Sequence, residues 1–219
     1  MTSVPADKMP AAPGLPGSKR MKSASPKTVA EIVTPERLLA AYARSYFPMD
    51  VDGETWWFSP DPRAVLALDR FHASKTLLQT CRGGRFVVRF DTAFQEVIRA
   101  CQDRPEGSWI SEEMIRAYTE LHRLGFAHCV EAWKGDDLAG GLYGVAIGGA
   151  FFGESMFHRR RDASKVALVA LVERLRERGY ILLDIQWMTE HLRRFGAVEI
   201  PRASFLKRLR AAIALDCRF

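Results

Sequence analysis

The spacing of apolar positions along the chain changes twice and predicts different structures on either side of each change. Residues 1–30 hold five prolines and few large apolar groups. Burial there cannot offset the entropy lost on ordering, so we expect a disordered, basic, Pro-rich tail. Next, Thr34 is a good N-cap for a helix that runs to about Arg44. An aromatic loop follows, in which Pro48, Pro60 and Pro62 exclude a long regular element.

From about residue 71 the pattern becomes regular. Alternating or continuous apolar runs predict strands, and a 3.6-residue spacing between capping residues predicts helices. In chain order we expect a strand over 85–90, helices over 92–101 and 112–124, strands over 127–133, 138–147 and 150–156, a helix over 163–178, a strand over 181–186, a helix over 189–195, a strand over 197–200 and a basic helix from about 204. Hairpins followed by a strand–helix–strand unit predict an α+β fold with a mixed sheet, antiparallel first and parallel later.

The first turns of three of these helices carry capping residues. Asp91 or Thr92 is expected to cap the first helix, Ser111 the second, and Asp162 or Ser164 the third. Each predicted cap satisfies backbone N–H groups that a helix leaves free at its start.

Composition narrows the class of protein. A hydrophobic content of 47% with 26% charged residues is typical of a folded globular chain. No apolar run approaches the roughly 18 residues of a membrane span, and the basic N-terminus lacks the apolar segment of a secretory signal. The four cysteines contain no C-x-x-C pair. We therefore expect reduced thiols and a cytoplasmic location.

The usual catalytic motifs are missing. There is no Walker loop and no G-x-G-x-x-G, and the stretch 153–157 begins like a nucleophile elbow but ends in Phe157 where the final glycine is needed. The five histidines show no H-E-x-x-H spacing. We expect no metal site, because the ligand clusters that zinc requires are absent from the sequence.

Polar residues inside apolar strands are the more informative signal. Asp184 and Gln186 lie two apart in a nearly apolar strand, so they share one face, and Glu154 ends the apolar run of another strand. Polar groups at the carboxyl ends of strands that lead into helices lie where open α/β sheets bind ligands. The alternative is structural: Asp184 caps or pairs locally, and Gln186 belongs to a satisfied core network.

Two further groups of residues suggest binding. Arg159, Arg160, Arg161 and Lys165 surround a predicted helix N-terminus, which favours an anion such as phosphate, although a solvated run of charge is the alternative. The second group is aromatic and could stack on nucleobases, line an apolar pocket or simply pack between parts of the protein. Its members are Tyr42, Tyr46, Phe47, Trp56, Trp57, Phe58 and Trp109.

Several segments together resemble the leucyl/phenylalanyl-tRNA protein transferase family. They are Tyr46-Phe47-Pro48-Met49, WFSPDPRAVL (57–66), Ser108-Trp109-Ile110, GGLYG (140–144), FGESMF (152–157), Ala163-Ser164-Lys165 and LDIQ (183–186). The resemblance covers about Pro35 to Leu209. It implies a small N-terminal domain over 31–66 and a GNAT-like, mixed-sheet acyltransferase domain over 67–219. It also implies transfer of leucine or phenylalanine from aminoacyl-tRNA to the α-amine of proteins that begin with Arg or Lys, which marks them for degradation, without a cofactor.

The resemblance also implies roles for individual residues. Gln186 would hold the attacking amine through its side-chain carbonyl. It would not act as a general base, because an amide oxygen is too weakly basic. Asp184 would support it electrostatically or relay a proton, and Glu154 would lie near the terminal adenosine, with a ribose hydroxyl as its partner. The aminoacyl pocket would be apolar and could also accept methionine. Its expected residues are Tyr42, Met49, Trp109, Tyr118, Leu142 and Phe151.

The distribution of charge fits these partners better than the net charge of +6 does. Residues 31–158 carry 13 basic and 18 acidic residues, whereas residues 159–219 carry 14 basic and 7 acidic residues. We expect the C-terminal third to face tRNA phosphates and the acidic middle to suit a cationic acceptor. An acyl-CoA-dependent N-acetyltransferase and a non-enzymatic RNA-binding module are the alternatives; the first would need a glycine-rich loop that residues 159–165 lack.

Overall fold

The computed structural model describes residues 19–21, 33–105 and 107–219. Its strands form two sheets, one of three strands in the order β1-β3-β2 and one of seven in the order β10-β4-β9-β8-β7-β6-β5. The strands are β1 (Lys19–Met21), β2 (Phe47–Val51), β3 (Glu54–Ser59), β4 (Arg63–Leu66), β5 (Val87–Phe90), β6 (Ala127–Lys134), β7 (Asp137–Ile147), β8 (Ala150–His158), β9 (Leu182–Gln186) and β10 (Ala197–Ile200). The helices are α1 (Pro35–Tyr42), α2 (Lys75–Arg82), α3 (Phe94–Gln102), α4 (Glu112–Arg123), α5 (Ala163–Glu177), α6 (Glu190–Arg193) and α7 (Arg202–Ile213).

The seven-stranded sheet confirms the predicted α+β class. Strands β5 to β8 pair antiparallel, and β8 pairs parallel with β9 across the helix α5, as a strand–helix–strand unit requires. The last strand departs from the prediction, because β10 pairs antiparallel with β4 at the far edge, and β4 pairs antiparallel with β9. The sheet therefore has one parallel pair, β8–β9, between two antiparallel parts.

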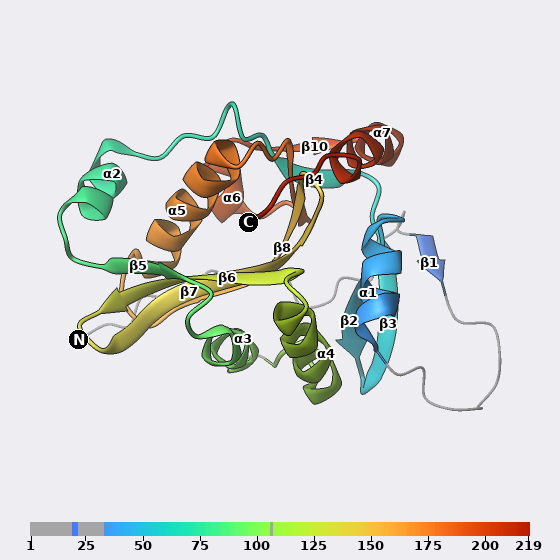
Figure 1. The fold of residues 1–219 in the computed structure, drawn as a ribbon, viewed down its shortest axis with the longest axis horizontal. Helices are drawn as coiled ribbons and strands as arrows, with labels where there is room; N and C mark the ends of the chain where they lie inside the picture. The colour runs from blue at the N-terminus through green and yellow to red at the C-terminus, as the bar shows by residue number, and fades with distance from the viewer. Residues whose placement is uncertain (1–18, 22–32, 106) are drawn as a thin grey trace.

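Helices cover both faces of this sheet, as Figure 1 shows, with α5 on one side and α3 and α4 on the other. Buried residues of α1, α3, α4 and α7 belong to one apolar cluster, which we call the α4-face cluster. Buried residues of α2 and α5 belong to a second, the α5-face cluster. Alternate side chains of each central strand contribute to each cluster, as they must in a sheet buried on both faces.

The N-terminal part is more regular than its sequence suggests. Thr34 caps α1 as predicted, since its hydroxyl accepts the N–H of Arg37. The predicted aromatic loop contains β2 and β3, which form a hairpin, and Pro48 lies within β2. The prediction was wrong here because short strands tolerate proline where no ladder hydrogen bond is needed. Strand β4 joins the seven-stranded sheet.

The predicted disordered tail is described only over Lys19–Met21, and the rest of it lies outside the described residues. These three residues form β1, which pairs with the edge of β3. Backbone pairing to a sheet edge needs no large apolar side chains, which is why composition did not indicate it.

Two helix starts differ from the prediction, and one helix was missed. Neither Asp91 nor Thr92 caps α3; instead the buried Glu131 carboxylate accepts the N–H groups of Thr92 and Ala93. Asp162 precedes α5 in a left-handed conformation, and neither its side chain nor a serine makes a capping bond. Helix α2 follows the N-cap Ser74 and buries only Leu77, so its apolar signal is weak.

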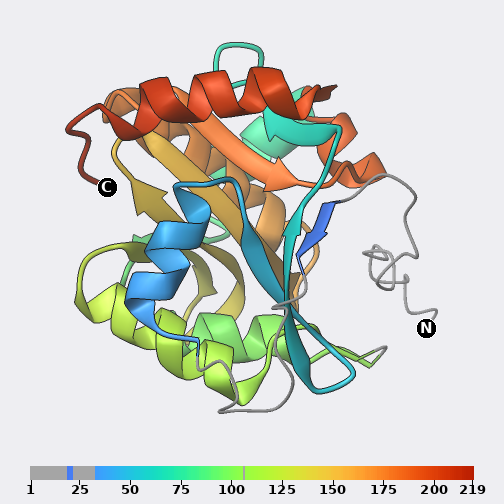
Figure 2. The same ribbon diagram turned by 90° about the vertical axis from the view of Figure 1, so that its right-hand side faces the viewer.

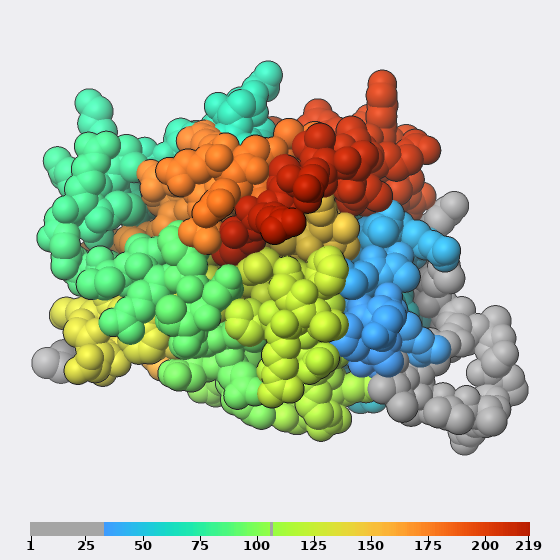
Figure 3. All heavy atoms as spheres, viewed as in Figure 1, coloured from blue at the N-terminus to red at the C-terminus, as the bar shows by residue number. Residues whose placement is uncertain are grey.

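The C-terminal segment packs on the outside of the molecule. Helix α7 crosses one end, above α1, in the view of Figure 2. The last residues then lie between α5, in orange, and the green residues that run from β5 to α4, as Figure 3 shows. There the Phe219 ring stacks on His128 and on Phe151, with centroids 4.3 and 5.4 Å away.

Candidate active site

The candidate site begins where the parallel pair β8–β9 stops pairing. The last paired residues are Phe152 and Asp184, although β8 continues to His158 and β9 to Gln186. On its other edge β8 has an irregular register with β7, where Tyr143 faces Ser155 and Gly144 faces Gly153. This bulge places Glu154 beyond the last β8–β9 pair, and such irregularities redirect side chains at functional sites.

Glu154 and Gln186 meet across this opening. The Gln186 Nε2 donates to Glu154 Oε1 over 3.1 Å, and both residues are buried. Because the amide nitrogen points to Glu154, the amide carbonyl oxygen points away from it and is the acceptor that Gln186 can offer to a ligand.

Asp184 is held by a cation from a distant part of the chain. Arg63 on β4 donates from Nε and Nη2 to the two oxygens of Asp184, over 2.8 and 2.5 Å, and both side chains are completely buried. The guanidinium also donates to the Ser45 carbonyl and lies 4.7 Å from the ring centroids of Phe47 and Phe205. Asp184 therefore pairs with a long-range cation, and it also accepts a local backbone N–H, as the predicted structural alternative describes.

This ion pair fixes the conformation of Gln186. Its backbone has a φ of 57°, in the left-handed region that residues other than glycine rarely adopt. The backbone N–H of Gln186 donates to Asp184 Oδ1 over 3.1 Å and so stabilises this conformation. Arg63, Asp184 and Gln186 act as one unit in which the cation orients the carboxylate and the carboxylate orients the amide.

Glu154 has a tyrosine pair on its other side. The Tyr118 hydroxyl on α4 donates to Glu154 Oε2 over 3.2 Å, and the Tyr42 hydroxyl on α1 lies 2.5 Å from that of Tyr118. Burial, with a smaller contribution from the Asp184 charge, raises the pKa of Glu154 to about 8 against the lowering effects of the tyrosine hydrogen bonds and Arg63. Burial, together with the nearby Glu154 charge, also raises the pKa values of both tyrosines. The network runs Arg63–Asp184–Gln186–Glu154–Tyr118–Tyr42, and we call it the buried network.

The six predicted pocket residues lie in two places. Tyr42 and Tyr118 belong to the buried network, Met49 lies in the same α4-face cluster, and Trp109 packs against that cluster. Leu142 and Phe151 instead lie in the α5-face cluster. Four of the predicted residues thus lie on the face of the sheet that carries the Glu154 carboxylate, and two lie on the other.

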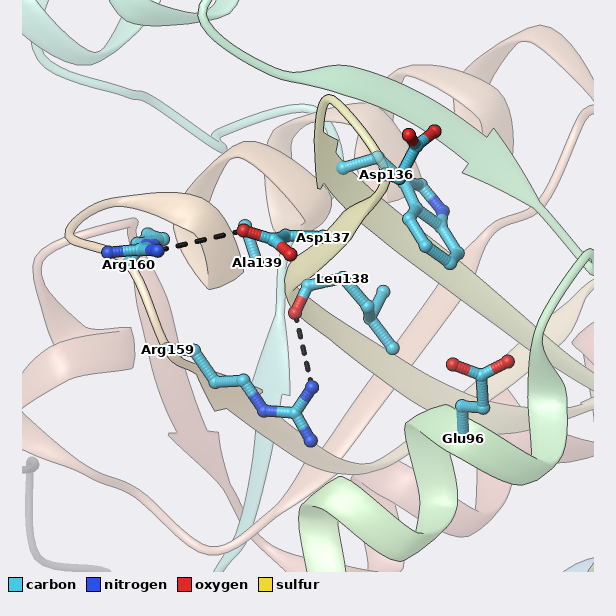
Figure 4. A pocket seen from close by; sticks show the side chains of 8 residues that line it. Glu96, Asp136, Asp137, Leu138, Ala139, Arg159 and Arg160 are labelled. Atoms are coloured by element: carbon cyan, nitrogen blue, oxygen red, sulfur yellow. Dashed lines mark hydrogen bonds and ion pairs between the residues drawn. The ribbon is translucent and has the colours of Figure 1, made fainter.

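The predicted phosphate-binding loop has mixed charge. Arg160 pairs with Asp137 over 3.6 Å, Arg159 donates to the Leu138 carbonyl, and both line a cavity of about 420 Å³ (Figure 4). Arg161 and Lys165 both pair with Asp162, over 3.6 and 3.0 Å. Glu96, Asp136 and Asp137 line the same cavity. An anion bound here must therefore compete with nearby carboxylates.

Arg63 and Ser45 are the members of this site that the sequence did not indicate. Arg63 lies 121 positions from Asp184, so no spacing connects them. A signal did exist, because one arginine begins the short apolar strand Arg63–Leu66 in which every residue is buried. A buried arginine needs a partner, and the buried Asp184 is the complementary charge.

Over residues 33–105 and 107–219, no cluster of three or more His, Cys, Asp or Glu side chains is placed to hold a metal ion. No helix among the described residues is long and apolar enough to cross a membrane.

Comparison with known proteins decides the family. The sequence model of leucyl/phenylalanyl-tRNA protein transferase matches residues 65–210, and that of the N-terminal domain of the same family matches residues 32–61. The chain belongs to the leucyl/phenylalanyl-tRNA protein transferase family. This confirms the predicted family, and the second match confirms that a small N-terminal domain precedes the larger one.

Curated relatives support this assignment over most of the chain. A leucyl/phenylalanyl-tRNA--protein transferase from Rubrobacter xylanophilus is 60% identical over 189 residues, which cover 85% of this chain and 98% of the relative. One from Gloeobacter violaceus is 56% identical over 190 residues, covering 85% and 97%. One from Anaeromyxobacter sp. strain K is 51% identical over 215 residues, covering 96% and 92%.

Solved structures add less. The structure of L-PGS from Bacillus licheniformis aligns with a TM-score of 0.39 and 13% identity, covering 73% of this chain and 55% of that one. A likeness at this level carries no argument about the leucyl/phenylalanyl-tRNA protein transferase fold, so the predicted GNAT-like topology stays a prediction.

Proposed function

We propose that this chain transfers leucine or phenylalanine from aminoacyl-tRNA to the α-amine of proteins that begin with Arg or Lys, which marks those proteins for degradation. Membership of the leucyl/phenylalanyl-tRNA protein transferase family supports the reaction class. The observation that carries the proposal is the buried pair of Glu154 and Gln186, which face each other beyond the last residues paired between β8 and β9.

The reaction needs an amine to attack the ester carbonyl that joins the amino acid to the tRNA ribose. The Gln186 carbonyl oxygen accepts an N–H of the amine and so aims the nitrogen at the carbonyl carbon. Asp184 acts on the reaction through Gln186, whose backbone it holds. Glu154 lies beside Gln186 and near the ester and the terminal adenosine, where its remaining lone pairs can accept a ribose hydroxyl.

The side chain of the transferred amino acid needs an apolar pocket. Tyr42, Met49, Trp109 and Tyr118 lie on the face of the sheet that holds Glu154, and we propose that they form this pocket. Leu142 and Phe151 lie in the cluster on the opposite face of the sheet, so the pocket that we propose does not include them. An apolar pocket separates side chains by only about 1–3 kcal/mol per methylene group, so leucine, phenylalanine and methionine can all be accepted.

The larger partners follow from the same reaction. Arg159, Arg160, Arg161 and Lys165 remain our candidates for tRNA phosphate contacts, although each has a partner within the protein. We also propose that the larger domain is GNAT-like and that the enzyme works in the cytoplasm.

The test is a labelling assay. Purified protein with radiolabelled leucyl-tRNA should label a peptide that begins with Arg but not the same peptide with Ala in first position. Gln186→Ala should lose most of the rate while binding leucyl-tRNA as wild type does in a filter assay. Absence of label on both peptides with the wild-type protein would overturn the proposal, and equal labelling of both would overturn the acceptor rule.

A further inference from the structure

Two buried carboxylates share this site, and only one of them touches a cation among the described residues. Asp184 receives two hydrogen bonds from Arg63 and one from the Gln186 backbone. Glu154 receives hydrogen bonds from an amide and a tyrosine hydroxyl, both of which are neutral donors. Carboxylates in such different environments take different roles in acid–base chemistry.

We propose that Arg63 gives the two carboxylates different roles. Arg63 holds Asp184 ionised as an anchor for Gln186, and Glu154 takes the proton from the attacking amine. In this arrangement Glu154 is the catalytic residue, and Arg63 and Asp184 are positioning residues. The inference rests on the proposed aminoacyl transfer and names the group that moves the proton.

The proton transfers balance as follows. The acceptor enters as an ammonium group, and one proton moves from its nitrogen to Glu154. The free amine attacks the ester carbonyl carbon, so a C–N bond forms and the carbonyl electrons move to oxygen. When the intermediate collapses, the bond from the carbonyl carbon to the ribose 3′ oxygen breaks. That oxygen takes a second proton from nitrogen, and Glu154 releases the first proton to solvent.

The geometry around Glu154 suits this role. Its two oxygens accept hydrogen bonds from Gln186 on β9 and Tyr118 on α4, so the carboxylate lies next to the amide that is proposed to bind the attacking nitrogen. The other ionisable groups that act on it are Tyr42 on α1, Tyr143 on β7, Asp184 on β9 and Arg63 on β4. Arg63 is paired with Asp184, and the remaining groups are tyrosines and that one carboxylate. Glu154 is therefore not held as a permanent ion.

Proton affinities are also matched. Burial raises the pKa of Glu154 to about 8, and a chain's α-amine has an ordinary pKa of about 7.7–8.0. A proton therefore passes between the two at little cost in free energy. A general base is most effective when its pKa lies near the pH at which the enzyme works.

The experiment measures kcat/KM for an Arg-initiated peptide from pH 6 to 9.5, with saturating leucyl-tRNA. Glu154→Gln keeps the shape of the side chain but cannot take a proton, and we expect a loss of about 100-fold or more. Asp184→Asn can still accept the Gln186 N–H and leaves Arg63 unopposed, so it should keep more activity than Glu154→Gln and move the acid limb of the profile to lower pH. In a Glu154→Gln background, which has no carboxylate left to titrate at this position, the same Asp184→Asn change should not move the pH profile.

Arg63 is tested through the same limb. Arg63→Met alone leaves a buried, uncompensated carboxylate and can fail to fold, so Arg63→Met/Asp184→Asn, which removes both charges, is the informative variant. Its acid limb should lie close to that of wild type, since the two lost charges act on Glu154 in opposite directions. Circular dichroism and filter binding of leucyl-tRNA confirm that each variant is folded and binds substrate.

The inference is overturned if Glu154→Gln keeps kcat/KM within threefold of wild type. It is also overturned if Asp184→Asn loses as much activity as Glu154→Gln and does not move the limb, because Asp184 would then be the proton acceptor. Failure of the proposed function looks different: wild-type protein itself would label neither peptide.

Discussion

Two groups of charged side chains in this protein differ in their exposure to water. The buried network contains Arg63 and Asp184, both with no exposed side-chain surface. The loop after β8 also pairs arginine with aspartate, but Arg160 is 56% exposed and its partner Asp137 is 74% exposed. The same two residue types therefore form an ion pair in each place, in opposite surroundings.

The difference in burial decides what each pair can do. Exposed pairs contribute about 0–1 kcal/mol and exchange freely with salt or a ligand phosphate. A buried pair cannot exchange its partner, because an unpaired charge in the interior is strongly unfavourable. The buried pair is thus suited to fixing geometry and the exposed pairs to reversible binding, so a count of charges along the sequence does not separate a catalytic site from a solvated loop.

Removing Arg63 should have the largest effect on stability. Arg63→Met leaves Asp184 as a buried carboxylate without its cation, and such losses cost about 3–5 kcal/mol of unfolding free energy. Urea unfolding followed by circular dichroism measures it. Arg161→Met, in a side chain that is 88% exposed, is the matched control and should change stability little. A cost below about 1 kcal/mol for Arg63→Met would mean that the interior around Asp184 admits water.

Glu154 should make stability depend on pH. Its pKa of about 8 in the folded protein lies above its ordinary value of 4.5, so between these values the folded state binds more protons than the unfolded state. Its contribution to stability is therefore full below about pH 4.5 and is lost as the pH rises through about 8. Glu154→Gln should remove this dependence and be more stable than wild type at pH 9, by about 1.4 kcal/mol for each unit by which folding raises the Glu154 pKa, with a much smaller difference at pH 5.

Urea midpoints of wild type and Glu154→Gln at pH 5 and pH 9 measure this difference. Glu120→Gln, at an exposed position on α4, serves as control and should show no such change between the two pH values. A Glu154→Gln variant that follows wild type at both pH values would show that Glu154 is ionised at low cost where it lies.

The same contrast explains how far the sequence could predict this protein. The strands β6 to β9 and the helices α4 and α5 follow local patterns of apolar residues, so periodicity was enough to predict them. The features that were missed depend on long-range contacts. Within the site, Arg63 meets Asp184; away from it, Glu131 accepts the N–H groups of Thr92 and Ala93, just before α3, from 39 and 38 residues along the chain. Asp184, Gln186 and Glu154 stood out because each is polar within an apolar strand, but nothing local indicates which cation pairs with which carboxylate.

Gly144 should show an intermediate effect, through packing rather than charge. A Cβ atom at this position would overlap the Phe152 carbonyl oxygen and the Phe151 ring. Gly144→Ala therefore forces the bulge beside Glu154 to move, with an expected cost of about 1–3 kcal/mol in unfolding free energy. Gly153→Ala, whose Cβ would lie at an ordinary 3.5 Å from the Asp184 carbonyl oxygen, should cost less in the same urea experiment. Equal costs for both would show that the strand adjusts freely at the bulge.

The exposed loop should show the smallest effect on stability and a clear effect on tRNA binding. Arg160→Ala should stay within about 0.5 kcal/mol of wild type in urea unfolding, because both partners of its ion pair are exposed. If Arg160 contacts a tRNA phosphate, the variant should raise KM for leucyl-tRNA and lower the slope of log affinity against log salt by about 1.

Asp137→Asn should act in the opposite direction and lower KM, since it frees Arg160 and removes a carboxylate from the cavity shown in Figure 4. Arg178→Ala, beyond the other end of α5, is the control for loss of one positive charge. Equal changes in KM for Arg160→Ala and Arg178→Ala would mean that the loop acts only through the overall charge of the protein.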